Sequence, residues 1–284
     1  LTGATAVTLR PPLRRHSDSS TGRLESSPRH LIMASSSSNI IVAVRVRPLS
    51  AKEKTRGAYA CIVVQDGKQI NVNDPDDKMG GIDYLRLDKT KDKAYAFDHA
   101  FETAITQQAV FEGTAQRVIP DVLRGCNACV FAYGATGSGK TYTMMGGGDS
   151  SPGVVLLTVD DIFARISEMS EEHAATVTMQ YCEIYNEAIK DLLEPSNTAL
   201  DVREAPGPRG TFVAGAAVVP VNSRAELEAL IYKGNLSRTT EATNVNEVSS
   251  RSHAVLQLRF EMTPRFDPSA GTRCGKLSMI DLAG

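Results

Sequence analysis

At 284 residues the chain is long enough to bury the core of one large domain or two small ones. Its 42% hydrophobic and 23% charged residues are ordinary for a globular protein, and no run approaches the ~18 apolar residues of a membrane span. The formal net charge of −2 excludes an overall attraction to nucleic acid or acidic membranes, so an anionic partner would have to meet a local basic patch.

The cysteines do not indicate a disulfide-rich protein. There are five, an odd number spread along the chain. Cys126 and Cys129 form a C-x-x-C, the spacing of redox and zinc sites. Because no second pair and no histidine lie near them in the sequence, we favour two buried thiols over either kind of site. Reduced thiols are typical of an intracellular compartment.

The first 38 residues differ in composition from the rest. They are rich in arginine and serine, have few acids and show little apolar periodicity. We expect residues 1–38 to form a disordered lead, with Met33 as a candidate true start. A transit peptide has a similar composition and is the alternative. The folded domain is expected to occupy residues 39–284.

From residue 39 onward, predicted strands and helices alternate. A hairpin is expected to turn at Asp66 and Gly67, residues 74–93 are expected to form an exposed loop, and Ser223 with Glu226 forms a capping box. The hydrophobic pattern predicts strands at 39–48, 60–72, 128–134, 176–187, 253–262 and 276–284, and helices at 106–124, near 154–169 and from 223. This alternation favours an α/β fold with a mixed, mostly parallel central sheet and helices on both faces.

The strongest local signal is "GATGSGKT", which fits G-x-x-x-x-G-K-[ST] between a predicted strand and a predicted helix. Glycines let the backbone fold tightly, so that successive N–H groups point at phosphate oxygens. The lysine reaches the β- and γ-phosphates and the last hydroxyl coordinates Mg²⁺. We therefore expect a nucleoside triphosphate to bind at Gly134, Ala135, Thr136, Gly137, Ser138, Gly139, Lys140 and Thr141.

Two later stretches carry the residues of a nucleotide-sensing switch. In "NEVSSRSH", residues 246–253, small hydroxyls surround one arginine, and such hydroxyls can bond a γ-phosphate, an attacking water and Mg²⁺. In "DLAG", residues 281–284, the aspartate ends a predicted buried strand, where it can hold the water shell of Mg²⁺. The glycine just beyond can offer its N–H to the γ-phosphate.

In this order after the phosphate loop, the two stretches resemble the kinesin motor domain. The likeness covers the chain from about residue 39 to its end and includes "RVRP", "VFAYG", "TYTM" and "EIYNEAIKDLL". It implies an ATP-dependent microtubule motor head with the kinesin–myosin type of P-loop NTPase core. Alanine at position 135 and "SSRSHAVLQ" are most similar to the kinesin-eight class of the family.

The resemblance also implies how the base is held. Arg45 and Pro48 resemble the adenine side of the pocket, and Tyr142 stands where a ring stacks on the base. ATP is expected rather than GTP, because the guanine-reading pattern [NT]-K-x-D lacks its final acid in residues 90–93.

The catalytic and metal-binding roles follow from the same resemblance. Ser250 is expected to face Mg²⁺, Ser249 the attacking water, and Arg251 an acid that closes the site. Asp281 is expected to hold Mg²⁺ through water, and Gly284 to sense the γ-phosphate.

The implied partner is the microtubule. Lysines in the 74–93 loop could meet the acidic tubulin surface, although an ordinary solvated loop is an equally good interpretation. We expect no nucleic acid and no membrane span, a location in the cytoplasm on the microtubule cytoskeleton, and dimers only through a neck or stalk of a longer parent protein.

In kinesins the "DLAG" pattern continues to a glutamate that pairs with the switch arginine, here Arg251. The sequence is therefore interpreted as a motor domain truncated at its second switch, poorly stable and weakly active or inactive alone. The alternatives are a non-motile kinesin-like protein that binds nucleotide or microtubules, and a general P-loop nucleotide kinase or GTPase. The last would not require the serine-arginine stretch.

Overall fold

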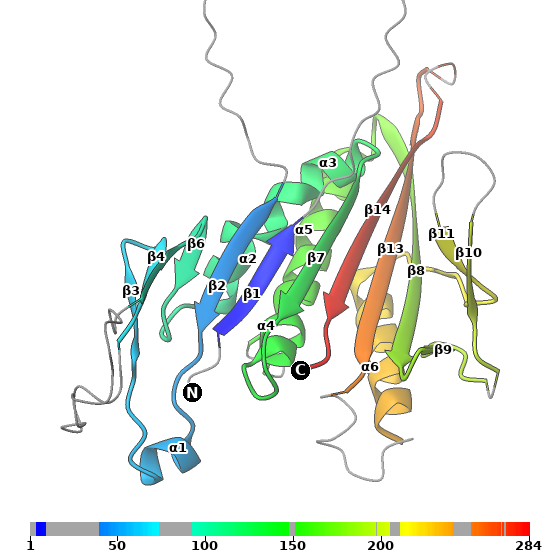
Figure 1. Cartoon of the computed structure of the whole chain (residues 1–284). Coiled ribbons are helices and arrows are strands. Elements are labelled where there is room, and N and C mark those ends of the chain that lie inside the picture. The colour runs from blue at the N-terminus through cyan, green and yellow to red at the C-terminus, as the bar shows by residue number, and fades with distance from the viewer. Residues whose placement is uncertain are drawn as a thin grey trace, which may run out of the picture.

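The computed structural model describes the backbone of residues 4–9 and 239–240 and, with side chains, residues 40–73, 93–147, 151–196, 198–204, 211–238, 251–267, 269 and 271–284. A nine-stranded sheet crosses the whole molecule (Figure 1). Its strands, in spatial order, are β12 (Val219–Pro220), β8 (His173–Tyr185), β13 (His253–Pro264), β14 (Arg273–Asp281), β7 (Asn127–Tyr133), β1 (Ala4–Leu9), β2 (Ile41–Val46) and β6 (His99–Phe101), with β9 (Ala188–Asp191) also paired to β8.

The sheet is mixed, as expected, but it is not mostly parallel. Of its eight neighbouring pairs only β14–β7 and β2–β6 are parallel. The expectation failed because β8, β13 and β14 form antiparallel pairs. The short connection between β13 and β14 can join only antiparallel neighbours, since a parallel connection needs a crossover of a dozen or more residues.

Two smaller sheets flank the large one. The first contains β3 (Ile62–Gln65), β4 (Gln69–Val72) and β5 (Lys93–Ala96), and the second contains β10 (Asp201–Glu204) and β11 (Thr211–Ala214). The predicted hairpin turn is confirmed: Asp66 and Gly67 both have positive φ, 51° and 64°. Those angles suit the right-handed twist of a two-residue hairpin.

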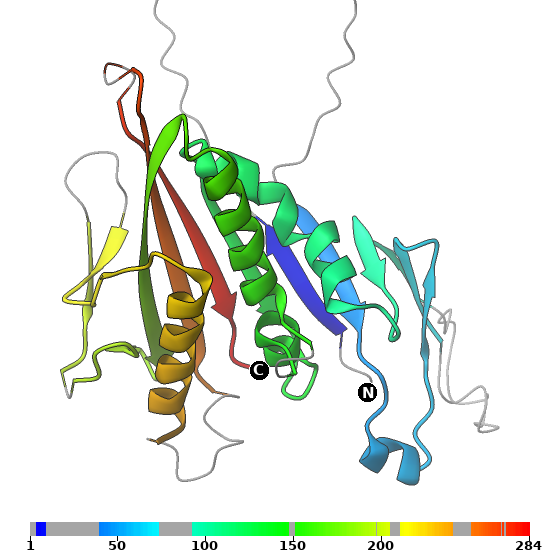
Figure 2. The ribbon, with the colours of Figure 1, turned by 180° about the vertical axis from the view of Figure 1, so that it is seen from behind.

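The described helices cover one face of the large sheet. They lie behind the strands in Figure 1 and in front of them in Figure 2, so the expected cover on both faces is not found among the described residues. The helices are α2 (Gln107–Gly113), the 3-10 turn η3 (Ala115–Val118), α3 (Ile119–Leu123), α4 (Lys140–Met145), α5 (Val154–Glu168) and α6 (Arg224–Thr240), with α1 (Ala51–Thr55) below the sheet.

The single helix predicted over 106–124 is divided into three pieces. Thr114, between α2 and η3, has φ −128° and ψ −94°, far from helical values. Its hydroxyl also donates to the carbonyl of Val110, which competes with the helical pattern. Pro120 then lacks the N–H that a continuous helix would use and stands at the start of α3. The apolar face predicted for this region is nevertheless buried.

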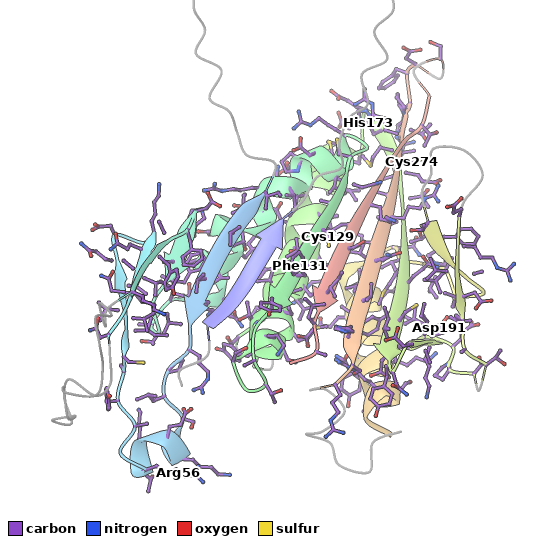
Figure 3. The ribbon with its side chains drawn as sticks, in the orientation of Figure 1. Arg56, Cys129, Phe131, His173, Asp191 and Cys274 are labelled. Atoms are coloured by element: carbon purple, nitrogen blue, oxygen red, sulfur yellow. The ribbon has the colours of Figure 1, made fainter. Side chains whose placement is uncertain are left out.

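The main core lies between the sheet and these helices. On β7, Ala128, Val130 and Ala132 are buried against the helices, so the alternate residues Cys129 and Phe131 face the other way (Figure 3). Both cysteines of the C-x-x-C are free thiols, as expected, but they are only partly buried. Within the described residues, no helix is long and apolar enough to cross a bilayer, and no cluster of His, Cys, Asp and Glu could hold a metal.

Strand β1 differs from the expectation for the N-terminal lead. Residues 1–38 were predicted to be disordered, but Ala4–Leu9 is a strand that pairs antiparallel with six residues of β2 and four of β7. It fills the space between two strands that would otherwise leave rows of backbone donors and acceptors unpaired. The lead therefore contributes to the sheet at these six positions.

We predict that a protein beginning at Met33 unfolds at a lower temperature than residues 1–284. The ten register pairs of β1 contribute about 1 kcal/mol net per ladder hydrogen bond, and ordering its six residues costs about 1 kcal/mol each. A loss of about 4 kcal/mol is therefore expected, which corresponds to a fall of roughly 8–16 °C. Thermal unfolding followed by circular dichroism measures the difference. Val7→Pro in the full chain removes a ladder donor and should reproduce part of the loss. Equal unfolding temperatures for all three proteins would contradict the pairing.

Candidate nucleotide-binding site

The phosphate-loop motif has the local structure that its sequence predicts. β7 ends at Tyr133, residues 134–139 form a loop, and α4 begins at Lys140. Gly137 and Gly139 adopt left-handed φ angles of 78° and 97°, which residues with a Cβ rarely adopt. Within the loop the Ser138 N–H donates to the Ala135 carbonyl at 3.0 Å. The predicted strand–loop–helix arrangement is confirmed.

The side chain of Lys140 is hydrogen-bonded to the backbone of the phosphate loop. Its side chain is 7% exposed, and Nζ donates to the carbonyls of Gly134 at 2.9 Å and Ala135 at 3.2 Å. Burial lowers the pKa of Lys140, whereas the nearby carboxylate of Asp281 raises it. An ammonium held by two carbonyl oxygens at the loop mouth can exchange them for phosphate oxygens, which are stronger acceptors.

Thr141 and Asp281 meet beneath the loop although 140 residues separate them. The Thr141 hydroxyl donates to Asp281 Oδ2 at 2.7 Å. They meet because β7 and β14 are parallel neighbours, with Asp281 opposite Ala132, so both strands end at the same place. The sequence predicted both as metal-site residues, and the structure brings them together.

The carboxylate of Asp281 is poorly solvated. Its side chain is 2% exposed, and Oδ1 has no hydrogen-bond partner among the described groups. Burial raises the pKa of Asp281, and the hydrogen bond from Thr141 and the charge of Arg238 partly offset that rise. A buried, unpaired anionic oxygen beside a hydroxyl is a donor set that suits Mg²⁺, which binds hard oxygen ligands and keeps several waters. These two residues fit the expected cation.

Gly284 lies against the phosphate loop. A Cβ at this position would stand 2.3 Å from Thr136 Oγ1 and 2.6 Å from Thr136 N, so only glycine permits this approach. The preceding residue, Ala283, donates its N–H to His253 Nδ1 at 3.0 Å. His253 begins β13, so this bond joins the start of that strand to the "DLAG" segment. The role of His253 was not predicted.

Arg45 and Tyr142 lie together at the other side of the loop. The Arg45 guanidinium is 5.2 Å from the centroid of the Tyr142 ring and donates to Gln107 Oε1 at 2.6 Å and to Thr143 Oγ1 at 3.2 Å. Gln107 in turn donates to the Tyr142 carbonyl at 2.6 Å. Burial lowers the pKa of Arg45. Gln107, which sequence reasoning missed, therefore links the two predicted residues.

The third residue of the predicted base pocket is less closely involved. Pro48 is exposed, and its carbonyl accepts from Arg47 Nη1 at 2.9 Å. Among the described residues, Pro48 makes no hydrogen bond to Arg45 or Tyr142.

A buried ion pair between Arg238 and Glu183 lies next to Asp281. Arg238 Nε donates to Glu183 Oε1 at 3.1 Å, Nη2 donates to the Ser252 carbonyl at 2.9 Å, and Nη1 lies 3.9 Å from Asp281 Oδ2. Arg238 and Glu183 are 7% and 5% exposed. One sequence signal could have identified Arg238: it continues the helical spacing of Leu227, Ile231 and Gly234, so it belongs to the buried stripe of α6.

The first switch is described only in part. Ser249 and Ser250 lie within residues 241–250, outside the described residues, so their predicted roles stay predictions. Arg251 is exposed at the start of the next described segment.

We predict that the two buried aspartates respond differently to amidation. Asp191 is fully satisfied: Oδ1 accepts from the N–H groups of Leu193 and Glu194, and Oδ2 from that of Ala217. Asp191→Asn should therefore lower stability by about 2 kcal/mol, or roughly 4–8 °C. Asp281→Asn removes a charge with an unpaired oxygen and should leave the nucleotide-free protein as stable or more stable.

Differential scanning calorimetry of both variants with and without Mg-ATP tests this. The thermal shift caused by Mg-ATP should fall in Asp281→Asn and persist in Asp191→Asn. An equal loss of nucleotide-free stability in both variants would contradict the orphaned state of the Asp281 oxygen.

Comparison with known proteins identifies the chain's relatives. Residues 45–284 match the family of the kinesin motor domain. Kinesin-like protein KIN-8A of Oryza sativa subsp. japonica is 41% identical over 87% of this chain and 31% of its own length. Kinesin-like protein KIF19 of Homo sapiens is 42% identical over 86% of this chain and 24% of its own. The chain thus spans less than a third of these relatives.

A solved structure shares the fold. It is described as "Structure of a fast kinesin: Implications for ATPase mechanism and interactions with microtubules" and superimposes with a TM-score of 0.74 at 31% identity, covering 85% of this chain and 64% of the other. The resemblance predicted from the motifs is confirmed, including its leaning toward the kinesin-eight class. The chain belongs to the kinesin motor domain family.

Proposed function

We propose that this chain forms the nucleotide-binding part of a motor head that hydrolyses Mg-ATP and couples the reaction to microtubule binding and movement. The observation that carries the proposal is the contact between Thr141 and Asp281 beneath the phosphate loop, with Gly284 packed on Thr136. In this arrangement one segment that grips the phosphates touches another that can report whether the last phosphate is present.

Binding would begin with Lys140. Its ammonium leaves the carbonyls of Gly134 and Ala135 for the β- and γ-phosphate oxygens, while the loop N–H groups surround the triphosphate. The base would lie at Tyr142, whose ring is 47% exposed and backed by Arg45. An exposed ring with a cation behind it can stack on a flat heterocycle.

The metal site would be completed by Thr141, Asp281 and Ser250. Mg²⁺, when bound there, neutralises charge that develops on the phosphate oxygens. Asp281 would hold the ion through water, and Ser249 would orient the water that attacks the γ-phosphate. Catalysis of this type is mostly positioning and charge stabilisation rather than covalent chemistry.

Loss of the γ-phosphate would be sensed at Gly284. Its N–H would bond that phosphate, and any movement of residues 281–284 would pull on His253 through the bond from Ala283. The two switch segments would therefore move together. Arg238 limits how far they separate, because it contacts Ser252 in one segment and approaches Asp281 in the other.

The microtubule is proposed as partner from family membership. The similar solved structure is of a fast kinesin whose interactions with microtubules are named in its description. The chain would accordingly act in the cytoplasm on the microtubule cytoskeleton, and a neck or stalk in a longer parent protein would form dimers. Three lysines of the 74–93 loop would face tubulin. Lys89 and Lys91 lie outside the described residues, whereas Lys93 is exposed at the start of β5.

We predict that Lys140→Ala weakens binding of a fluorescent ATP analogue by about 100-fold or more, because a charged phosphate ligand is lost. Lys68→Ala, at the distant hairpin between β3 and β4, is the control and should bind as the parent does. Fluorescence anisotropy titration measures both. Undiminished binding by Lys140→Ala would remove the phosphate-loop assignment.

A second measurement separates the motor from a non-motile binding protein. In the whole protein, ATP turnover is expected to rise when microtubules are added, as followed by phosphate release. Binding to microtubules in a sedimentation assay without any change in turnover would instead support the non-motile alternative and count against the motor proposal.

A further inference from the structure

A second cleft lies at the end of the molecule away from the phosphate loop. It has a volume of about 250 Å³ and is formed where α3 and α5 end and where β8 and β14 begin. Figure 3 places His173 and Cys274 at this end, whereas the C-terminus, beside the phosphate loop, lies at the other. The 15 residues of α5 span about 22 Å between the two regions. The cleft is therefore separate from the nucleotide site.

The floor of the cleft is apolar. Leu123 and Met262 are 6% and 2% exposed, and Met169 and Pro120 complete the floor. A dry cavity of ~150 Å³ accommodates benzene, so this volume has room for a ligand of about ten non-hydrogen atoms. Two methionines among the four residues allow the floor to adapt to ligands of different shape.

The rim is basic. Three arginines, Arg124, Arg165 and Arg273, face the cleft together with one carboxylate, Glu168, which leaves a net charge of +2 on the lining. Arg124 already pairs with Asp121 at 2.6 Å, and Arg165 with Asp161 at 2.5 Å. Arg273 is exposed, and no carboxylate of the described residues pairs with it. It is therefore the rim cation best able to accept an anion.

His173 lies beside the apolar floor of the cleft. His173 Nδ1 is buried and makes no hydrogen bond to any described group. The backbone N–H of His173 donates to the Met169 carbonyl at 2.9 Å, which fixes the residue beside the apolar floor. Because less than 1 Å² of Nδ1 is accessible, this nitrogen is not open to the cleft, and a ligand there can meet only the other atoms of His173.

We propose that this cleft binds a small amphiphilic carboxylate, either a medium-chain fatty acid or an aromatic acid of similar size. The apolar part would lie on Leu123 and Met262, and the carboxylate would accept from Arg273. An apolar floor with a few convergent polar groups is the usual composition of a small-molecule site. Because the rim carries a net positive charge, it favours the carboxylate over an amine of the same size.

Octanoate, with ten non-hydrogen atoms, and octylamine, with nine, are the matched probes. We expect octanoate, titrated below its micelle concentration, to bind residues 1–284 in isothermal calorimetry and to shift the imidazole NMR signals of His173. Octylamine should do neither. Equal binding of the two probes would overturn the proposal, because the cleft would then select for apolar surface alone.

Two variants locate the anion. Arg273→Glu reverses an exposed charge and should weaken octanoate binding at least about tenfold, or ~1.4 kcal/mol, without changing the thermal unfolding temperature. Arg259→Glu, a charge reversal at another exposed strand position outside the cleft, is the control and should bind octanoate as the parent does. Unchanged affinity in Arg273→Glu, or no binding of octanoate to the parent protein, contradicts the assignment.

Discussion

The hydrogen bond between Thr141 and Asp281 is the interaction on which the site depends. It can form only because β7 and β14 run parallel and end at the same level, so that the residue after one strand's loop meets the last residue of the other. Parallel neighbours are the minority in this sheet, and the pair that carries the site is one of the two that exist among the described strands. One of the two parallel pairs therefore lies where the phosphate loop and residues 281–284, which are far apart in the sequence, come together.

In the protein without nucleotide, burying the charged groups of Asp281 and Lys140 at this site is unfavourable for the free energy of folding. A carboxylate that is 2% exposed and has one unpaired oxygen opposes folding, as does the nearly buried ammonium of Lys140. The buried pair of Arg238 and Glu183 adds a compensating positive charge near Asp281, but a buried ion pair seldom yields net stability. The apolar core between sheet and helices must supply that stability. A bound magnesium nucleotide would relieve both unfavourable charges at once.

The sequence alone was sufficient to predict the parts of the site that local rules determine. A phosphate loop is contiguous, and its glycines, lysine and threonine are required by φ angles and charge at fixed spacing. The acid at the end of a buried strand was predictable for the same reason. The partners of Gln107, Arg238 and His253 lie 14 to 62 residues away. The spacing along α6 marks Arg238 as buried, but no local pattern specifies what these three residues contact.

Errors in the predicted fold had the same origin. Strand direction depends on which strands become neighbours, and hydrophobic runs are alike in parallel and antiparallel positions. The lead was judged by composition, yet "ATAVTL" contains three β-branched residues of the kind common in strands. Its place between β2 and β7 is decided by those two strands. Helix cover was inferred from alternation along the chain, which does not determine the face on which each helix packs.

The outermost strands of the sheet have a further consequence. β6 has three residues and β12 has two, one of which, Pro220, cannot donate a backbone hydrogen bond. An exposed edge strand can pair with a strand of another chain. Very short edge strands, or edge strands that contain proline, make such pairing less favourable. The nine-stranded sheet therefore offers no extended template for amyloid-like growth at either outermost strand of its order, β12 or β6.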